Sequence, residues 1–286
     1  MGSIAQRIAK QILSYQDTNI VDMDSWREGK ECAEKMINTN HDPCYAEYVV
    51  GQNIASFIAE EICLLKEAKG FVRTVSQAED DYKPCGPPIS PLTLSYFTMW
   101  SMFDVLFGSS RETIGSCILC ILPKLDLPSG ILNTMKLMHL SRMGFYVHCG
   151  IEGKAVLLQE IHTGETVKCL VPSGYIGIRG QIWFVRVMEP PLASCLRHVV
   201  MGTPYVIRGF PAYEYADYLD REIKRLEQRK PPGMKDSYHH LMKYGLNPNH
   251  WNEYIFCAYS NYQHDAVFLH GVPDIPKSMP HGHLKR

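Results

Sequence analysis

The spacing of hydrophobic residues along the chain changes from a helical period to a strand period near Gly144. Before that residue, apolar positions recur about every 3.6 residues, as in amphipathic helices. Asp42-Pro43 and Ser90-Pro91 are typical helix starts, because a capping side chain precedes a proline that fits the first turn. We therefore predict a helical domain of about five helices over residues 1–144, in which the helix that starts at Asp42-Pro43 ends near Gly70.

After Gly144, short runs alternate between apolar and polar residues, and glycines occupy the links between the runs. Five or six such strands within about 65 residues are typical of a small barrel or a strongly curled sheet. We predict a small antiparallel β module over residues 145–210. Its strands are expected at 145–149, 155–161, 166–171, 181–188, 196–201 and 205–208.

Helical signals return in the last part of the chain. Two helices are predicted first, and a third begins at Pro248 and is expected to continue to about Gln263. Residues 211–270 are thus predicted as C-terminal helices, and residues 271–286, which contain three prolines, as an extended tail. The predicted fold class is α+β, with a helical N-terminal domain, a small antiparallel β barrel or curled sheet, and C-terminal helices.

The composition is that of an ordinary globular protein. The chain has 286 residues, of which 45% are hydrophobic and 21% charged, and 29 basic side chains nearly balance 30 acidic ones. A chain of this length buries roughly three quarters of its unfolded surface, so it can form a core without disulfides or a structural metal. These values exclude a disordered or collagen-like protein, and the near-zero net charge argues against a general polyanion binder.

Ten cysteines are an unusual count. The N-terminus carries charges and lacks the apolar run of a signal peptide, and no stretch reaches the ~18 apolar residues of a membrane span. We therefore expect a cytoplasmic protein without membrane association, with reduced thiols. Cys117 and Cys120 have the spacing of a dithiol or of half a zinc site, but apolar neighbours favour buried thiols, as they do for Cys169.

Polar side chains capable of chemistry gather near the C-terminus. On the helix predicted after Pro248, Trp251 and Ile255 fall on the buried face. Beside them runs a line of polar residues, which we call the polar line: His250, Glu253, Cys257, Asn261 and His264. This line predicts either a pocket wall with acid–base chemistry or a half-buried helix whose polar groups are hydrogen-bonded structurally, and the second interpretation is favoured.

The functional interpretation gives individual residues a role. The candidate catalytic residues are titratable groups along the line and at its end, namely His250, Glu253, His264 and Asp265. The candidate metal ligands are a cysteine of the line and a histidine pair from the preceding helix, namely Cys257, His239 and His240. On one helix His250 and His264 would be about 21 Å apart, so zinc or another divalent ion would need ligands from a second segment.

Sequence signatures of phosphate binding, dinucleotide binding, zincins and α/β-hydrolases are absent. Gly174, Gly177 and Gly180 stand between two β runs, where turn formation explains them. Aromatic and basic residues of the β module permit nucleic-acid binding. Nucleic acid is not the favoured partner, because basic residues are sparse and Arg186 shares a face with apolar neighbours.

Two pieces of the β module resemble a known pattern. Gly164 and Glu165 match a "tGe" hairpin, and Gly180 and Arg186 match the first glycine and the arginine of a "pGdllfaRv" strand. Residues 155–208 are in this respect similar to a small β module of uncharacterised bacterial proteins, often found beside SEC-C motifs. The SEC-C motif itself is missing from this chain, and the resemblance implies no activity.

Two functional hypotheses follow. The first is a binding or adaptor protein with a protein partner, no cofactor and no catalytic activity of its own. It is motivated by the missing catalytic signatures and by an aromatic-rich helix at 96–107. The alternative is a metal-assisted hydrolase or nuclease-like enzyme that uses the His/Glu/Asp cluster of the C-terminal helices, since histidine titrates near neutral pH.

Overall fold

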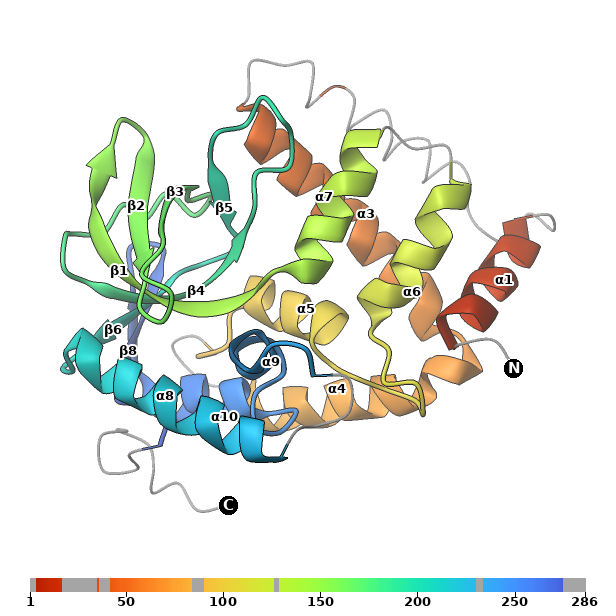
Figure 1. The fold of residues 1–286 in the computed structure, drawn as a ribbon. Coiled ribbons are helices and arrows are strands. Elements are labelled where there is room, and N and C mark those ends of the chain that lie inside the picture. The colour runs from red at the N-terminus through yellow and green to blue at the C-terminus, as the bar shows by residue number, and fades with distance from the viewer. Residues whose placement is uncertain are drawn as a thin grey trace. The chain divides into compact units, whose positions relative to one another are not determined.

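The computed structural model describes residues 4–16, 35, 42–83, 90–125, 129–229 and 234–274 (Figure 1). Among these residues it contains nine α-helices and a closed five-stranded β-barrel with additional strands. About 50% of the structure is helical and 21% is in strands, so the predicted α+β class is confirmed.

The chain folds into two compact units, each assembled from separate stretches of sequence. The helical unit comprises Met1–Gln77, Met99–Leu140 and Glu189–Leu196. The barrel unit comprises Ala78–Thr98, Ser141–Met188 and Arg197–Arg286. The helices of the first half are α1 (Ile4–Gln16), α3 (Pro43–Cys63), α4 (Lys69–Tyr82), α5 (Leu94–Phe103), α6 (Ile114–Ile121) and α7 (Ser129–Leu140), with 3₁₀ turns at Lys66–Ala68 and Leu122–Lys124.

Helix α3 begins where the sequence predicts it, because the Asp42 carboxylate accepts a hydrogen bond of 3.0 Å from the Cys44 N–H. Its end differs from the prediction. The helix stops at Cys63 rather than near Gly70, since Leu65 adopts an extended conformation with ψ of 145°. A 3₁₀ turn and α4 then continue the chain in a new direction.

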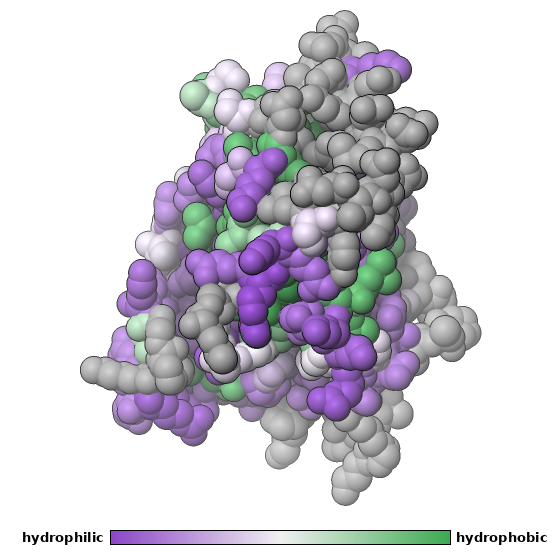
Figure 2. Space-filling model, turned by 90° about the vertical axis from the view of Figure 1, so that its right-hand side faces the viewer, coloured by the Kyte–Doolittle hydropathy of each residue, from purple (hydrophilic) through white to green (hydrophobic). Residues whose placement is uncertain are grey.

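Within the described ranges, no single helix combines the length and apolar composition needed to span a bilayer. α3 and the following Lys66–Tyr82 segment meet these criteria only together, and they are bent by 95° at their junction. On the face drawn in Figure 2, hydrophobic residues appear in small groups separated by hydrophilic ones.

The barrel closes through the strand order β1-β2-β3-β5-β4, with β4 returning to β1. The β3–β5 pair is parallel and the other pairs of the barrel are antiparallel. Trp183 and Val185, which the alternation places on one face, lie together in the barrel core with Cys169. The strands are β1 (Arg142–Glu152), β2 (Ala155–Glu160), β3 (Thr166–Leu170), β4 (Ile182–Met188) and β5 (His198–Val200).

A second sheet extends from the barrel. β4 pairs with β6 (Tyr205–Arg208), β6 pairs in parallel with β8 (Ala266–His270), and β8 pairs with β7 (Tyr259–Gln263). β5 and β6 both run antiparallel to β4, but the register against β4 changes between Val200 and Tyr205. β5 therefore closes the barrel, while β6 leads the sheet away from it.

The opposite faces of β1 and β4 carry an aromatic cluster that holds two C-terminal helices. Phe145 stacks on Phe184 with ring centroids 4.7 Å apart, and Tyr215 and Trp251 lie within 5.1 Å of these rings. Tyr215 belongs to α8 (Ala212–Arg229) and Trp251 to α10 (His250–Ala258), while α9 (Ser237–Tyr244) packs against α8 and β1. Burial of such large rings stabilises the barrel unit.

The helix that we predict from Pro248 to about Gln263 is wrong in its second half, because α10 ends at Ala258 and the next residues form β7. His264 and Asp265 have positive φ angles of 49° and 58°, which close a two-residue hairpin between β7 and β8. The 211–270 segment thus contains two strands besides its helices.

The tail predicted over 271–286 is described only as far as Asp274, and its remainder lies outside the described residues. The described part is bound to the barrel unit. The Gly271 carbonyl accepts hydrogen bonds from the hydroxyls of Tyr215 at 2.9 Å and Tyr254 at 3.0 Å, and Asp274 pairs with Arg221.

Candidate functional site: a groove beside the barrel

A groove of about 440 Å³ lies where the β6–β8–β7 sheet leaves the barrel. One wall is the loop between β3 and β4, and the other is the β7–β8 hairpin turn, with Arg208 and Phe268 between them. All of these residues belong to the barrel unit. The volume falls within the range of small ligand and side-chain binding sites.

The floor of the groove continues the core face of the barrel. Trp183, Val206 and Phe268 stand side by side on β4, β6 and β8, and all three are members of the barrel core cluster. Arg208 follows Val206 by two residues and therefore projects from the same face. Its guanidinium carbon lies 3.7 Å from the centre of the Phe268 ring, as in a cation–π contact.

Arg208 is the cation of this site. Within the part of the chain that the structure describes, its guanidinium forms no ion pair or hydrogen bond, and the side chain is exposed. A guanidinium that stacks on a ring keeps its N–H donors available at the edge of its plane. The groove thus offers an unpaired anion-binding group over an aromatic surface.

The β3–β4 loop is held in one conformation by Gln181. Its Oε1 atom accepts hydrogen bonds from the Ile178 N–H at 3.1 Å and the Trp183 indole at 3.2 Å. Its amide nitrogen donates to the Tyr175 hydroxyl at 3.1 Å. The side-chain amide of Gln181 therefore connects the loop to Trp183 of the barrel core, and these hydrogen bonds make this wall of the groove rigid.

Gly177 and His148 add to the constraint on this loop. Gly177 has φ of 60°, and a Cβ atom there would lie 2.5 Å from the Trp183 ring and 2.7 Å from Gln181. The buried His148 ring lies within hydrogen-bond distance, 2.9 Å, of the Ile176 carbonyl. In the sequence, Gly177 is explained by turn formation. The structure shows that the close packing of Trp183 and Gln181 also requires a glycine at this position.

Two isoleucines of this rigid loop are exposed to solvent. Ile176 is 60% exposed and Ile178 is 69% exposed, and both line the groove. Single exposed hydrophobic residues are common on protein surfaces. A binding surface is the more typical setting for two exposed isoleucines on one preorganised loop, next to an aromatic floor and an unpaired arginine.

The polar line does not persist as a line in the structure. His250, at the start of the line, is half-buried, and its Nε2 atom is 2.8 Å from the Tyr218 hydroxyl of α8. Burial lowers the pKa of His250 to about 4, although Asp274 opposes this effect, so the ring is neutral at pH 7. Its surroundings are those of a structural hydrogen bond.

The other candidate residues are dispersed over the barrel unit. Glu253 is exposed and Cys257 is partly buried on α10, while His239 and His240 are on α9. Burial, together with Lys243 and Arg142, lowers the pKa of His239 to about 4. The His240 ring lies 5.1 Å from the ring of Tyr244, one turn further along the same helix.

Only His264 and Asp265 among the predicted residues reach the groove, where they form the hairpin turn. Five extended residues separate them from the end of α10, which corresponds to about 17 Å. No group of three or more His, Cys, Asp or Glu side chains within the described ranges could hold a metal ion. The alternative, a metal-assisted enzyme, therefore stays a prediction, and the structure does not bring its candidate residues together in one site.

Sequence reasoning missed the residues that build the groove. Arg208 and Phe268 are sixty positions apart in sequence and meet only because β6 pairs in parallel with β8. Tyr175 lies within the glycine-rich stretch Gly174–Gly180 and Gln181 directly follows it, so this stretch was the one available signal. The hydrogen bonds of Gln181 depend on side-chain packing that a pattern of glycines does not encode.

No family model, no curated protein and no solved structure matches the chain. The similarity of residues 155–208 to a β module found beside SEC-C motifs stays a prediction.

Proposed function

We propose that the protein is a binding or adaptor protein without catalytic activity of its own, and that its groove binds a segment of a partner protein. The segment would carry an aliphatic side chain next to an Asp or Glu residue. The observation that carries this proposal is the pair of exposed isoleucines on a rigid loop beside the unpaired Arg208.

The rigidity of the loop supports binding because it lowers the entropy that is lost on association. Gln181 and His148 already fix the backbone at Ile178 and Ile176. A partner that covers these side chains therefore gains the hydrophobic free energy without ordering the loop. Preorganised apolar residues of this kind are frequent centres of binding energy.

The charge of the groove supports an acidic group in the partner. Arg208 projects over Phe268, and Arg179 is exposed on the same loop as the two isoleucines. A hydrogen bond between a guanidinium and a carboxylate contributes about 1.5–3 kcal/mol when water is partly excluded. Asp265 in the opposite wall would disfavour a segment that is acidic throughout.

A selection from random heptapeptides displayed on phage tests the proposal. We expect the wild-type protein to enrich peptides in which Leu, Ile or Val stands within two positions of Asp or Glu. The Arg208→Ala variant should bind the enriched peptides about tenfold or more weakly, because it lacks the charged hydrogen bond. Ile178→Glu should abolish binding, since it places a carboxylate in the apolar contact.

Ile151→Glu is the matched control, because Ile151 is 49% exposed in the same unit but lies outside the groove. This variant should bind like the wild type. The proposal is contradicted if no peptide is enriched, or if the enriched peptides bind Ile178→Glu and Ile151→Glu equally well.

A further inference from the structure

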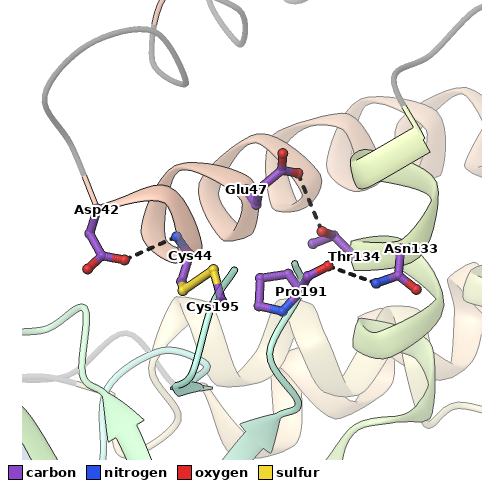
Figure 3. Close-up of a disulfide and its surroundings, with 7 residues drawn as sticks. All are labelled: Asp42, Cys44, Glu47, Asn133, Thr134, Pro191 and Cys195. Carbon is purple, nitrogen blue, oxygen red and sulfur yellow. Dashed lines mark hydrogen bonds between the residues drawn. A yellow bond between two sulfur atoms is a disulfide. The ribbon is translucent and has the colours of Figure 1, made fainter. Parts of the chain in front are cut away.

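A disulfide between Cys44 and Cys195 joins two parts of the helical unit that are 151 residues apart in sequence (Figure 3). Cys44 lies in the first turn of α3, and Cys195 lies in the loop between β4 and β5, residues 189–197. The expectation of reduced thiols is thus wrong for this pair. The two residues are 2% and 6% exposed.

The β4–β5 loop is held at two points. The Asn133 side chain of α7 donates a hydrogen bond of 2.7 Å to the Pro191 carbonyl, and the disulfide holds the loop at Cys195 (Figure 3). On either side of Cys195, Ser194 is exposed and Leu196 is 85% exposed. Cys195 is therefore a buried sulfur in an otherwise exposed stretch, and a small opening of this stretch gives a reductant access to it.

Six other described cysteines are free thiols, and four of them have a raised pKa. Burial raises the pKa of Cys117 and of Cys169 to about 12, and it raises the pKa of Cys63 and Cys120 as well. These thiols carry almost no thiolate at pH 7, and thiolate is the reactive form. They do not compete with the Cys44–Cys195 pair in exchange reactions.

The position of Cys44 suits it to leave as a thiolate. The N-terminus of a helix favours negative charge, and Cys44 follows the Asp42 cap and Pro43 at the start of the 21-residue helix α3. Glu47, one turn further on, directs its carboxyl group away from the sulfurs and toward the Thr134 hydroxyl, 3.5 Å away (Figure 3). Burial raises the pKa of Glu47, and the hydrogen bond from Thr134 opposes this rise.

We propose that Cys44 and Cys195 form a reversible redox-modification site, at which a dithiol reductant opens the disulfide and releases the second half of the β4–β5 loop. A thiolate of the dithiol attacks Cys195 Sγ, the protein S–S bond breaks, and Cys44 leaves as a thiolate that takes up a proton. The second thiol of the reductant then attacks the mixed disulfide. Cys195 is released as a thiol and the reductant becomes a cyclic disulfide, so two electrons and two protons pass to the protein.

The consequence of reduction is local to the loop and the strand that follows it. The hydrogen bond from Asn133 still holds Pro191, so the first half of the loop stays in place. β5 begins three residues after Cys195 and is itself only three residues long. Reduction therefore loosens residues 193–200, which include the strand that closes the barrel.

Differential alkylation of the native full-length protein tests the proposal. The protein is treated with dithiothreitol without denaturant, and labelled cysteines are identified by peptide mass spectrometry. We expect Cys44 and Cys195 to become labelled together, well before Cys117 and Cys169. Hydrogen exchange of residues 193–200 should increase on reduction and return to its initial rate after air oxidation, and the Cys44→Ser/Cys195→Ser variant should show the fast exchange without reductant.

Asn133→Ala removes the hydrogen bond that holds the loop at Pro191 and should speed reduction several-fold. Asn53→Ala, at an exposed asparagine of α3, should leave the rate of reduction unchanged. Equal rates in these two variants would contradict opening of the loop as the route. Labelling of Cys44 and Cys195 only at the rate of Cys117 and Cys169 would show that reduction needs global unfolding. The disulfide would then be a structural staple, and the proposal would be overturned.

Discussion

The two ends of the polar line have opposite environments. His250 is half-buried at the start of α10 and hydrogen-bonded to Tyr218, whereas His264 lies in an exposed hairpin turn at the wall of the groove. Both residues looked equivalent as members of one predicted helix. Their difference shows that a residue type in a helical pattern indicates chemistry only if the helix continues, and here it ends at Ala258.

His250→Ala should have the largest effect on stability. The substitution leaves a cavity between α8 and α10 and deprives the buried Tyr218 hydroxyl of its partner, so we expect a loss of about 3 kcal/mol in the free energy of unfolding. His264→Ala should cost below about 1 kcal/mol, mainly for its positive φ. Denaturant unfolding of both variants measures the contrast, and equal losses would contradict the distinction.

Acid should destabilise the protein through two half-buried histidines, His250 and His239. The pKa values of His250 and His239 are lowered to about 4 in the folded state, while an unfolded histidine titrates near 6.5. The unfolded state thus binds these protons first, and stability falls as the pH decreases from about 6.5 to about 4. For His250 alone this amounts to about 2–3 kcal/mol.

Unfolding curves at several pH values test this dependence. In the His250→Gln variant the loss between pH 6.5 and 4 should be smaller than in the wild type. Arg208→Ala, which removes no titrating group in this range, should keep the wild-type slope. An unchanged slope in His250→Gln would mean that the half-buried ring of His250 is not held neutral in the folded state.

Gly177→Ala should disturb the groove more than Gly174→Ala does. Both glycines have positive φ, which costs an alanine about 1 kcal/mol. Only at Gly177 would the new methyl group also collide with Trp183 and Gln181, which adds about 1–2 kcal/mol and displaces the loop. Thermal unfolding and binding of the selected peptides compare the two, and equal effects would contradict the packing argument.

Arg208→Ala should have the smallest effect on folding. The cation–π contact with Phe268 contributes about 0.5–1 kcal/mol at an exposed site. The variant should therefore unfold almost like the wild type, while it loses the peptide binding predicted for the groove. A large loss of stability would show that Arg208 has a structural role instead.

The parts of the fold that depend on local pattern were predictable. The strand period after Gly144 correctly predicted a small barrel or curled sheet, although the β3–β5 pair is parallel rather than antiparallel. Trp183, Val185 and Cys169 lie in the barrel core as the alternation requires. The apolar surroundings of Cys117 likewise predicted its burial. In each case the residue type and its nearest neighbours in sequence are sufficient to predict where the side chain lies.

The parts that depend on long-range pairing were not predictable. β8 joins the sheet beside β6 in parallel, although about sixty residues separate them, and this pairing converts the expected end of a helix into β7. Cys44 and Cys195 meet across 151 residues. No spacing rule within one segment relates such partners, so the groove and the disulfide both required the structure.

The late position of β8 in the sequence has a consequence for synthesis on the ribosome. Phe268 and Ala266 complete the barrel core, yet they emerge roughly 60 residues after β6, which at about 5–20 residues per second is a delay of about 3–12 s. During that interval β6, which carries Val206, has β4 on one side but lacks its neighbouring strand β8 on the other. The edge of β6 that β8 covers in the finished protein is therefore, for a few seconds, an open strand edge that the growing chain must protect from aggregation.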